Sequence, residues 1–296
     1  MCGLPVRPVL RRTGGGGRGD GEPRRQAGHR PDEPHVPDGH DHRLRRGARR
    51  GGLQVQQPQR HGKLWLRVEL QRLTVAVPDG PEDGPADPLA GPAPSPEALR
   101  VPVDEIAARL AGRLERGAPP VPPAREPLRT ASVLALLTPE GEADERDGGP
   151  GLVLIERSAE LTNHAGQIAL PGGKPEPGDR DLWHTALREA EEEVGLAEPV
   201  DPLGRLGPVP TPTGFWIVPF VAVAPPSFRP VPNSGEVARV FVPSLARLAD
   251  PRIHRIEGRV PYRGRTYDLH SFDLGLRVPL WGATARVVWD LLRRLA

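Results

Sequence analysis

The segment that decides the fold runs from residue 171 to residue 196 and reads PGGKPEPGDRDLWHTALREAEEEVGL. The glycine pair at 172–173 ends a short apolar stretch, and a polar loop then leads into residues 182–194. Apolar side chains recur at helical spacing in that second part, and Gly195 occupies the position where helices commonly end. The segment therefore predicts a short strand, a glycine-rich loop and a helix, in that order.

Three acidic residues give this helix its chemistry. Glu189, Glu192 and Glu193 are related by i, i+3 and i+4, so their carboxylates project to one side of the helix. Like charges at that spacing repel, and a hard divalent ion with oxygen ligands, Mg²⁺ or Mn²⁺, is a natural occupant of such a group. Arg188 can brace the same carboxylates. The alternative from the charge pattern alone is a solvated acidic helix face.

The loop and the helix together resemble the Nudix box, which has a glycine, five residues, an acid, seven residues and then REUxEExGU, where U is apolar. Counted from Gly173, the acid falls at Asp179, and eight residues separate it from Arg188. The resemblance implies an α/β (α+β) Nudix fold, with a mixed β-sheet sandwiched between helices. It also implies metal-dependent hydrolysis of a diphosphate bond.

The spacing alone does not divide the roles among the helix residues, because all the acids face one site. We expect Glu189 and Glu193 to bind the ion directly. Glu192 is either the third ligand or the carboxylate that accepts a proton from the attacking water. Glu192 and Arg188 are the expected catalytic residues.

A second resemblance narrows the class. Residues 157–173 read RSAELTNHAGQIALPGG and are similar to the extra signature RSxxLRxHxGQxxFPGG of the coenzyme A diphosphatase branch. Thr162 stands where that signature has Arg, and Leu170 where it has Phe. The resemblance implies that Arg157, His164 and Gln167 contact substrate. It further implies cleavage of coenzyme A or acyl-CoA to 3′,5′-ADP and 4′-phosphopantetheine or its acyl form.

Two other functions compete with this interpretation. The same metal site could serve ADP-ribose or another nucleoside diphosphate derivative, although the 157–173 signature favours coenzyme A. A nucleic-acid-binding or regulatory protein on a Nudix scaffold, using the Arg-rich arm, is the alternative from another class. The intact acidic helix argues against that scaffold role, so we expect a small-molecule substrate rather than nucleic acid.

Several further residues admit two interpretations. Phe215 and Trp216 point to opposite faces of one predicted strand, so at most one can face a ligand while the other packs. Glu236 is either an exposed loop acid or a catalytic base. Trp281, at a helix start, suits core packing better than substrate stacking. His164 and Gln167 could also be a strand-edge histidine and a solvent-facing polar residue.

The N-terminal third of the chain has a different composition from the rest. Residues 1–50 contain 12 Arg and 6 acids but no Phe, Trp or Tyr, and such a segment buries too little apolar surface to offset its ordering entropy. A weak strand pattern covers residues 63–77, and an acidic Pro-rich linker covers 78–96. We therefore expect residues 1–94 to be a disordered extension, or a product of a mis-assigned translation start, and residues 95–296 to form the Nudix domain.

The remaining patterns complete the expected domain. They predict helices over residues 103–116, 245–249 and 283–295, and strands over 131–138, 152–156, 167–170, 203–207, 215–224, 237–242, 256–260 and 265–272. A single cysteine excludes a disulfide framework. Apolar runs are too short for a membrane span, and no secretory signal pattern is present. These features predict a soluble, cytoplasmic protein.

Overall fold

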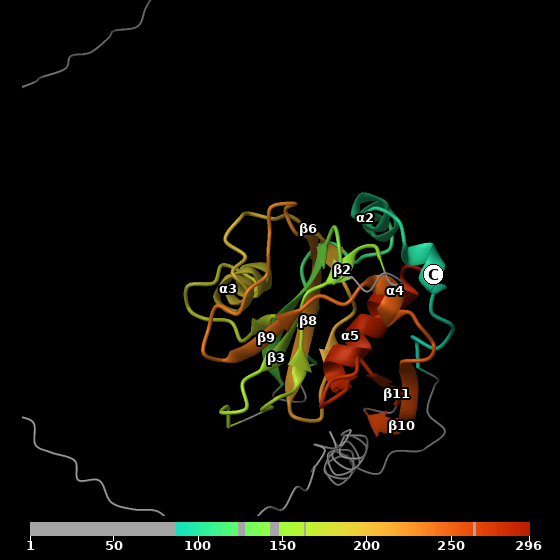
Figure 1. Ribbon diagram of the computed structural model, residues 1–296. Coiled ribbons are helices and arrows are strands. Elements are labelled where there is room, and N and C mark those ends of the chain that lie inside the picture. The colour runs from blue at the N-terminus through green and yellow to red at the C-terminus, as the bar shows by residue number, and fades with distance from the viewer. Residues whose placement is uncertain (1–86, 124–127, 143–147, 163, 263–264) are drawn as a thin grey trace, which may run out of the picture. The chain divides into compact units, whose positions relative to one another are not determined.

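A computed structural model describes residues 87–123, 128–142, 148–162, 164–262 and 265–296 (Figure 1). The predicted strand over 63–77 and most of the predicted extension lie outside these residues. Within the described ranges, no helix combines the length and the apolar character needed to cross a membrane.

The described chain forms five helical segments and twelve strands. The helical segments are a 3₁₀ helix η1 (Pro96–Leu99), α2 (Val103–Ala111), α3 (Leu182–Val194), α4 (Leu245–Leu248) and α5 (Gly282–Arg293). The strands are β1 (Arg129–Thr138), β2 (Gly151–Leu152), β3 (Leu154–Arg157), β4 (Ile168–Ala169), β5 (Gly172–Gly173), β6 (Pro202–Arg205), β7 (Val209–Pro210), β8 (Phe215–Val223), β9 (Val237–Phe241), β10 (His254–Tyr262), β11 (Arg265–Phe272) and β12 (Leu280–Trp281).

The central sheet is mixed, as expected. Its main path is β2-β1-β8-β6, with β5 paired to β1 and β7 paired to β8. The long strands β1 and β8 run parallel from the pair Arg129 and Phe215 to the pair Leu137 and Val223, whereas their other partners are antiparallel. Two three-stranded sheets, β4-β3-β9 and β10-β11-β12, complete the fold.

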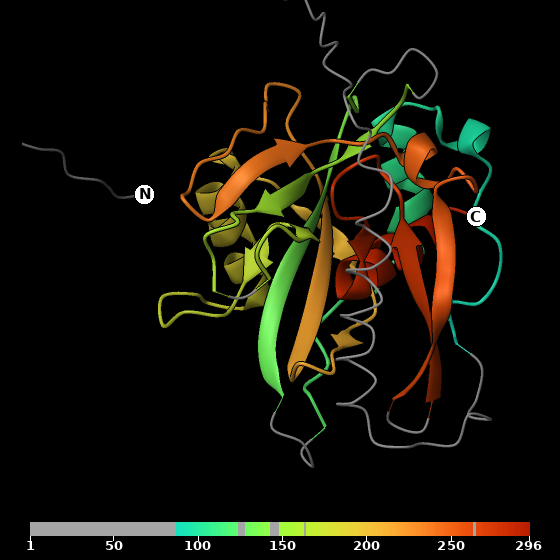
Figure 2. The same ribbon diagram turned by 60° about the horizontal axis from the view of Figure 1, so that its bottom comes forward.

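The two faces of the central sheet bury different cores. On one face, Leu134 of β1 and Val218 of β8 belong to the same buried cluster as Ala186 and Ala190 of α3. On the other face, alternate residues of the same strands join a larger cluster with α2, α4 and α5. Figures 1 and 2 show α3 on one side of the strands, with α5 and the β10–β11 hairpin on the other. The predicted sheet between helices is therefore confirmed.

Helix α2 is shorter than the sequence pattern suggests. It stops at Ala111 rather than continuing to residue 116, because the chain turns at Gly112 and then joins the sheet. The backbone of Glu115 exchanges both hydrogen bonds with Arg205 at 2.9 and 3.0 Å, and the two side chains also form an ion pair. Pairing with the strand thus replaces the last predicted helical turn.

The folded part of the chain begins before the predicted boundary at Ser95. The carboxylate of Asp87 is buried and forms an ion pair with Arg286 of α5 at 2.6 Å. Two residues later, the carbonyl oxygen of Leu89 accepts a hydrogen bond from Trp289 Nε1 at 3.0 Å. Residues 87–94, which the composition assigned to the extension, therefore include an anchor on the C-terminal helix.

Candidate metal and substrate site

The glycine pair brings the site together because it allows two close approaches. Strand β5 pairs antiparallel with β1, with Gly173 opposite Ser132. A Cβ atom at Gly173 would overlap the carboxylate of Glu189, and one at Gly172, where φ is +153°, would overlap the carbonyl oxygen of Ser132. Position 172 therefore requires glycine, because its obstacle is the β1 backbone, and a side chain at 173 would push the Glu189 carboxylate out of its place.

Helix α3 has the predicted limits, 182–194, since both of its ends are capped. The side chain of Asp181 accepts a hydrogen bond from the backbone N–H of His184 at 2.9 Å, which satisfies a free donor of the first turn. At the other end Gly195 adopts the left-handed conformation, with φ of 75°. Ala186, Ala190 and Val194 pack the helix onto the sheet, which fixes the orientation of its acids.

Glu193 is the most deeply buried of the three acids, with 4% of its surface exposed. Its Oε2 accepts a hydrogen bond from the Gly172 N–H at 2.9 Å, and its Oε1 lies 3.7 Å from an Arg157 guanidinium nitrogen. Burial raises the pKa of Glu193 to about 7, with the nearby charge of Glu189 adding to the rise and the Gly172 hydrogen bond opposing it. The carboxylate is thus only partly compensated by the protein.

Glu189 is less buried, and its carboxylate faces β5. Burial raises its pKa, although the positive charge of Arg188 opposes the shift. Glu192 differs from both, because its side chain is about half exposed and lies 3.1 Å from an Arg188 nitrogen. Burial therefore separates the three acids that helical spacing alone could not distinguish.

Arg188 connects the polar loop to the helix. Its guanidinium lies 3.1 Å from Asp179, 3.0 Å from Glu189 and 3.1 Å from Glu192, and it donates to the carbonyl oxygen of Lys174 at 3.0 Å. Hydrogen bonds from Arg188 are the main cause that lowers the pKa of Asp179 to about 2. Asp179, the acid that precedes Arg188 by eight intervening residues rather than the seven of the Nudix box, therefore holds Arg188 in place.

The signature segment closes into a loop beside Glu193. Arg157 is bonded through its backbone to Gly166 and Gln167, at 3.1 and 2.9 Å, and its side chain lies between Glu193 and Glu236, the latter at 3.2 Å. At the tip of the loop, His164 Nδ1 lies 2.9 Å from Gln167 Oε1. The structure thus brings Arg157 to the acidic helix, whereas the side chains of His164 and Gln167 contact each other.

The residues present suit a divalent cation. A buried carboxylate, Glu193, and a partly buried one, Glu189, lie one helical turn apart with raised pKa values, and oxygen donors of this kind are the preferred ligands of Mg²⁺ and Mn²⁺. A cation held by Glu189 and Glu193 would offset their mutual repulsion. Lys174 is a further residue of the site that the sequence analysis did not predict. Because it directly follows the glycine pair, its position in the sequence already places it beside the acidic helix.

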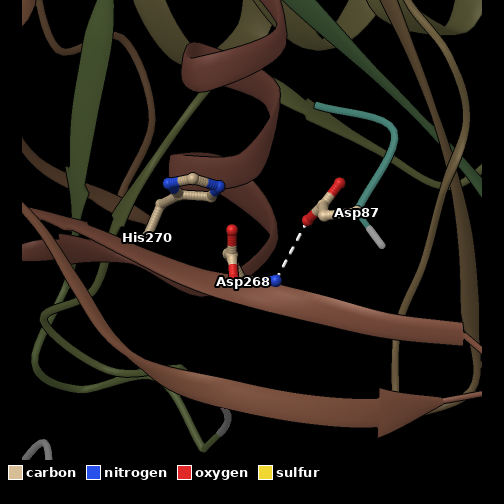
Figure 3. Close-up of side chains that lie close together, drawn as sticks. All are labelled: Asp87, Asp268 and His270. Atoms are coloured by element: carbon tan, nitrogen blue, oxygen red, sulfur yellow. Dashed lines mark hydrogen bonds between the residues drawn. The ribbon is translucent and has the colours of Figure 1, made fainter. Parts of the chain in front are cut away.

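A second group of potential ligands lies near α5 (Figure 3). Ligand atoms of Asp87, Asp268 and His270 lie within 4.8 Å of one another. Asp87, however, already accepts four hydrogen bonds: two from Arg286, at 2.6 and 2.9 Å, and one each from the backbone N–H groups of Leu89 and Asp268, at 2.9 and 3.0 Å. Four donors occupy the lone-pair directions of one carboxylate, so Asp87 acts as a structural anchor.

Comparisons with known proteins identify the family of this chain. The NUDIX domain family model matches residues 128–261. A relative from Photorhabdus laumondii, described as an uncharacterized Nudix hydrolase NudL, is 36% identical over 148 residues, which are 49% of this chain and 78% of the relative. A NudL from Citrobacter koseri is 38% identical over 154 residues, 49% of this chain and 76% of the relative. A Nudix hydrolase structure from M. smegmatis, RenU, aligns at 25% identity over 41% of this chain and 74% of that one, with a TM-score of 0.33.

The chain belongs to the Nudix hydrolase family. It is therefore an enzyme that hydrolyses a diphosphate substrate, and the predicted class is confirmed at this level.

Proposed function

We propose that this Nudix hydrolase cleaves the diphosphate bond of coenzyme A or acyl-CoA, giving 3′,5′-ADP and 4′-phosphopantetheine or its acyl form. The observation that carries the proposal is the position of Arg157. Its side chain reaches Glu193, while its backbone holds Gly166 and Gln167 of the signature loop. The segment that resembles the coenzyme A signature is thereby joined to the acidic helix.

The proposed chemistry assigns separate roles to the helix residues. Glu189 and Glu193 hold Mg²⁺ or Mn²⁺. Such an ion, when bound, neutralises phosphate oxygens and makes a coordinated water more acidic. Glu192, more exposed than the other two, accepts the proton of the attacking water, and Arg188 orients its carboxylate from 3.1 Å. Glu236, in contact with Arg157, is the alternative base.

The loop residues bind rather than react. When His164 Nδ1 donates to Gln167 Oε1, the amide NH₂ group of Gln167 keeps both of its donors for substrate oxygens. Arg157 lies between two carboxylates, Glu193 and Glu236, and so positions the loop beside the acids. The amide donors of Gln167 favour an oxygen-rich substrate, which coenzyme A provides and which ADP-ribose also provides.

A substrate panel tests the proposal directly. The full chain is incubated with coenzyme A, an acyl-CoA, ADP-ribose and nucleoside triphosphates in the presence of Mn²⁺, and products are separated by chromatography. We expect release of 3′,5′-ADP from coenzyme A at a kcat/KM above that for the other substrates. A preference for ADP-ribose or a triphosphate would overturn the assignment. Retention on nucleic acid that depends on residues 1–86 would favour the alternative class.

A paired variant tests the signature loop. Changing His164 and Gln167 together to Ala should lower kcat/KM for coenzyme A more than for a small nonspecific pyrophosphate, by about tenfold in the ratio, since a hydrogen bond to a charged group contributes about 1.5–3 kcal/mol. Glu160→Gln, an exposed change in the same loop, is the matched control. Equal losses on both substrates would show that the loop only supports the fold.

A further inference from the structure

A cationic aromatic cluster, made of Arg129, Lys174 and Phe215, lies where strand β5 leads into the polar loop of the site. The guanidinium carbon of Arg129 lies 4.2 Å from the centroid of the Phe215 ring, and Lys174 Nζ lies 5.9 Å from it. Arg129 and Lys174 have exposed side chains, whereas Phe215 is half-buried. Two cations therefore share one aromatic ring at the protein surface.

Rigid elements hold Phe215 and Arg129 in place. The two residues are direct partners in the parallel pairing of β8 with β1. In the turn before β8, the Thr211 hydroxyl accepts a hydrogen bond from the Phe215 N–H at 2.9 Å, and the Gly214 carbonyl oxygen accepts one from the Arg129 N–H at 2.9 Å. The segment TPTGF at 211–215 thus positions this ring.

Lys174 links the cluster to the acidic helix. It directly follows Gly173, which faces the Glu189 carboxylate, and its carbonyl oxygen accepts a hydrogen bond from Arg188 at 3.0 Å. Its backbone is therefore fixed by the catalytic helix while its ammonium group reaches Phe215. A substrate that extends from the acids past β5 would meet this cluster next.

The packing also decides which aromatic residue of β8 can face a ligand. Trp216 packs against the core under α3, and its indole N–H donates to the carbonyl oxygen of Pro120 at 3.0 Å. Phe215 points to the other side of the strand and, among the described residues, belongs to neither hydrophobic cluster. Its exposed partners are the two cations.

The charges of the cluster are uncompensated within the described part of the chain. The side chain of Arg129 donates to the carbonyl oxygen of Thr213 at 3.3 Å, and among the described residues neither Arg129 nor Lys174 forms an ion pair with a carboxylate. Cations without acidic partners beside an aromatic ring suit a phosphorylated base, because the charges attract the phosphate and the ring or guanidinium plane supports the base.

We infer that Arg129, Lys174 and Phe215 form the binding subsite for the nucleotide half of the substrate. The base stacks on the Phe215 and Arg129 surface, and the two cations bind the phosphate that lies outside the hydrolysed diphosphate. In coenzyme A this is the 3′-phosphate, so the inference rests on the proposed function. With this subsite the enzyme binds a nucleotide that carries the 3′-phosphate, such as 3′,5′-ADP, more tightly than one that lacks it, such as 5′-AMP.

Equilibrium binding to the two products separates the subsite from the chemistry. Calorimetry on the full chain measures the affinities for 3′,5′-ADP, 5′-AMP and 4′-phosphopantetheine. Phe215→Leu should weaken 3′,5′-ADP binding by about tenfold, within the range measured for base–aromatic stacking, and leave 4′-phosphopantetheine binding unchanged. Arg129→Gln and Lys174→Gln should each reduce the preference for 3′,5′-ADP over 5′-AMP by about threefold or more. Arg255→Gln, an exposed arginine on β10, is the matched control.

The outcomes distinguish the inference from the function on which it rests. Wild-type affinity in Phe215→Leu and Arg129→Gln, or equal loss for both products, would overturn the subsite. Phe215→Trp keeps an aromatic surface and should retain binding, which guards against a folding defect in Phe215→Leu. A wild-type chain that binds 3′,5′-ADP through these residues but does not cleave coenzyme A would refute the function and leave the subsite standing.

Discussion

Two buried acids of this protein, Glu193 in the site and Asp87 beside α5, have nearly equal exposure, 4% and 7%. Asp87 accepts four hydrogen bonds, two of them from Arg286, and these outweigh burial so that its pKa is lowered. Glu193 accepts one hydrogen bond, from Gly172, and its nearest arginine is 3.7 Å away, so burial raises its pKa to about 7. At nearly equal exposure, the hydrogen-bond donors and the charge of Arg286 lower the pKa of Asp87, whereas burial dominates for Glu193, which has a single donor.

The difference has a functional meaning. A buried carboxylate with all its lone pairs occupied contributes to stability and has no further ligand to bind. A buried carboxylate with too few hydrogen-bond donors lowers the stability of the folded protein, and a bound cation can offset that loss. Asp87 is therefore expected to matter for folding and Glu193 for catalysis.

The largest effect should come from removing the charge of Glu193. Glu193→Gln keeps the shape and the Gly172 hydrogen bond but removes a charged ligand, so hydrolysis should fall by about a thousandfold, because a bound cation supplies several kcal/mol of transition-state stabilisation. The melting temperature without metal at pH 8 should stay the same or rise, since a buried charge disappears. Glu191→Gln, on the exposed side of the same helix, is the control and should keep full activity. An active Glu193→Gln enzyme would refute the ligand assignment.

The second effect concerns the anchor. A chain that starts at Ser95 lacks Asp87 and leaves the partly buried Arg286 without its carboxylate partner, which should cost about 3 kcal/mol, whereas a chain that starts at Asp87 should match the full-length protein. Denaturant unfolding of the two chains and of full-length Asp87→Asn measures this difference. Both chains should remain active at temperatures where they are folded. Equal stabilities would mean that Asp87 and its donors are replaceable.

The third effect is the stabilisation of the folded protein by Mn²⁺, which should depend on Glu189 and Glu193 but not on Asp87. Mn²⁺ at a hundred times its dissociation constant should stabilise the wild-type chain by about 2.7 kcal/mol through binding to the folded state. This stabilisation is measured as a rise in melting temperature on adding Mn²⁺. The Glu189→Gln, Glu193→Gln double variant should lose the rise, and Asp87→Asn should keep it. If instead Asp87→Asn abolished the shift, the cation would bind near α5.

The site helix was predictable because its signals are local. The cap at Asp181, the apolar spacing and Gly195 lie within one segment, and they define residues 182–194 without reference to the rest of the fold. The grouping of Glu189, Glu192 and Glu193 follows from the same helix. Their unequal burial does not, since it depends on the passage of β5 between α3 and β1.

The anchor was not predictable, because its contacts join distant parts of the chain. Asp87 meets the backbone of Asp268 across 181 residues and Arg286 across 199. Composition assigned residues 78–96 to a linker, and no local pattern marks Asp87 as buried. The ring of Phe215 presents the same problem, since the cations beside it come from β1 and from the loop after β5.

The smallest effect is a dependence of stability on pH near the anchor. His270 is 4% exposed, and its Nδ1 lies 2.9 Å from Nε2 of His254. Burial, with a further contribution from His254, lowers the pKa of His270 to about 4, although the carboxylates of Asp87 and Asp268 oppose the shift. The unfolded chain, with a histidine pKa of about 6.5, therefore binds the proton first as the pH falls.

The contribution of His270 to stability should accordingly be constant above pH 7 and decrease as the pH falls through 6.5 toward 4, whereas the raised pKa of Glu193 acts in the opposite direction over the same range. Between pH 7.5 and pH 5, His270 should reduce the free energy of unfolding by about 2 kcal/mol, because its imidazole takes up a proton in the unfolded chain and stays neutral in the folded protein. Denaturant unfolding at the two pH values measures it. His270→Gln should remove this part of the pH dependence, whatever its own stability, while His164→Gln, an exposed histidine, should keep it. An unchanged pH dependence in His270→Gln would mean that other groups near α5, His254 among them, bind the proton instead.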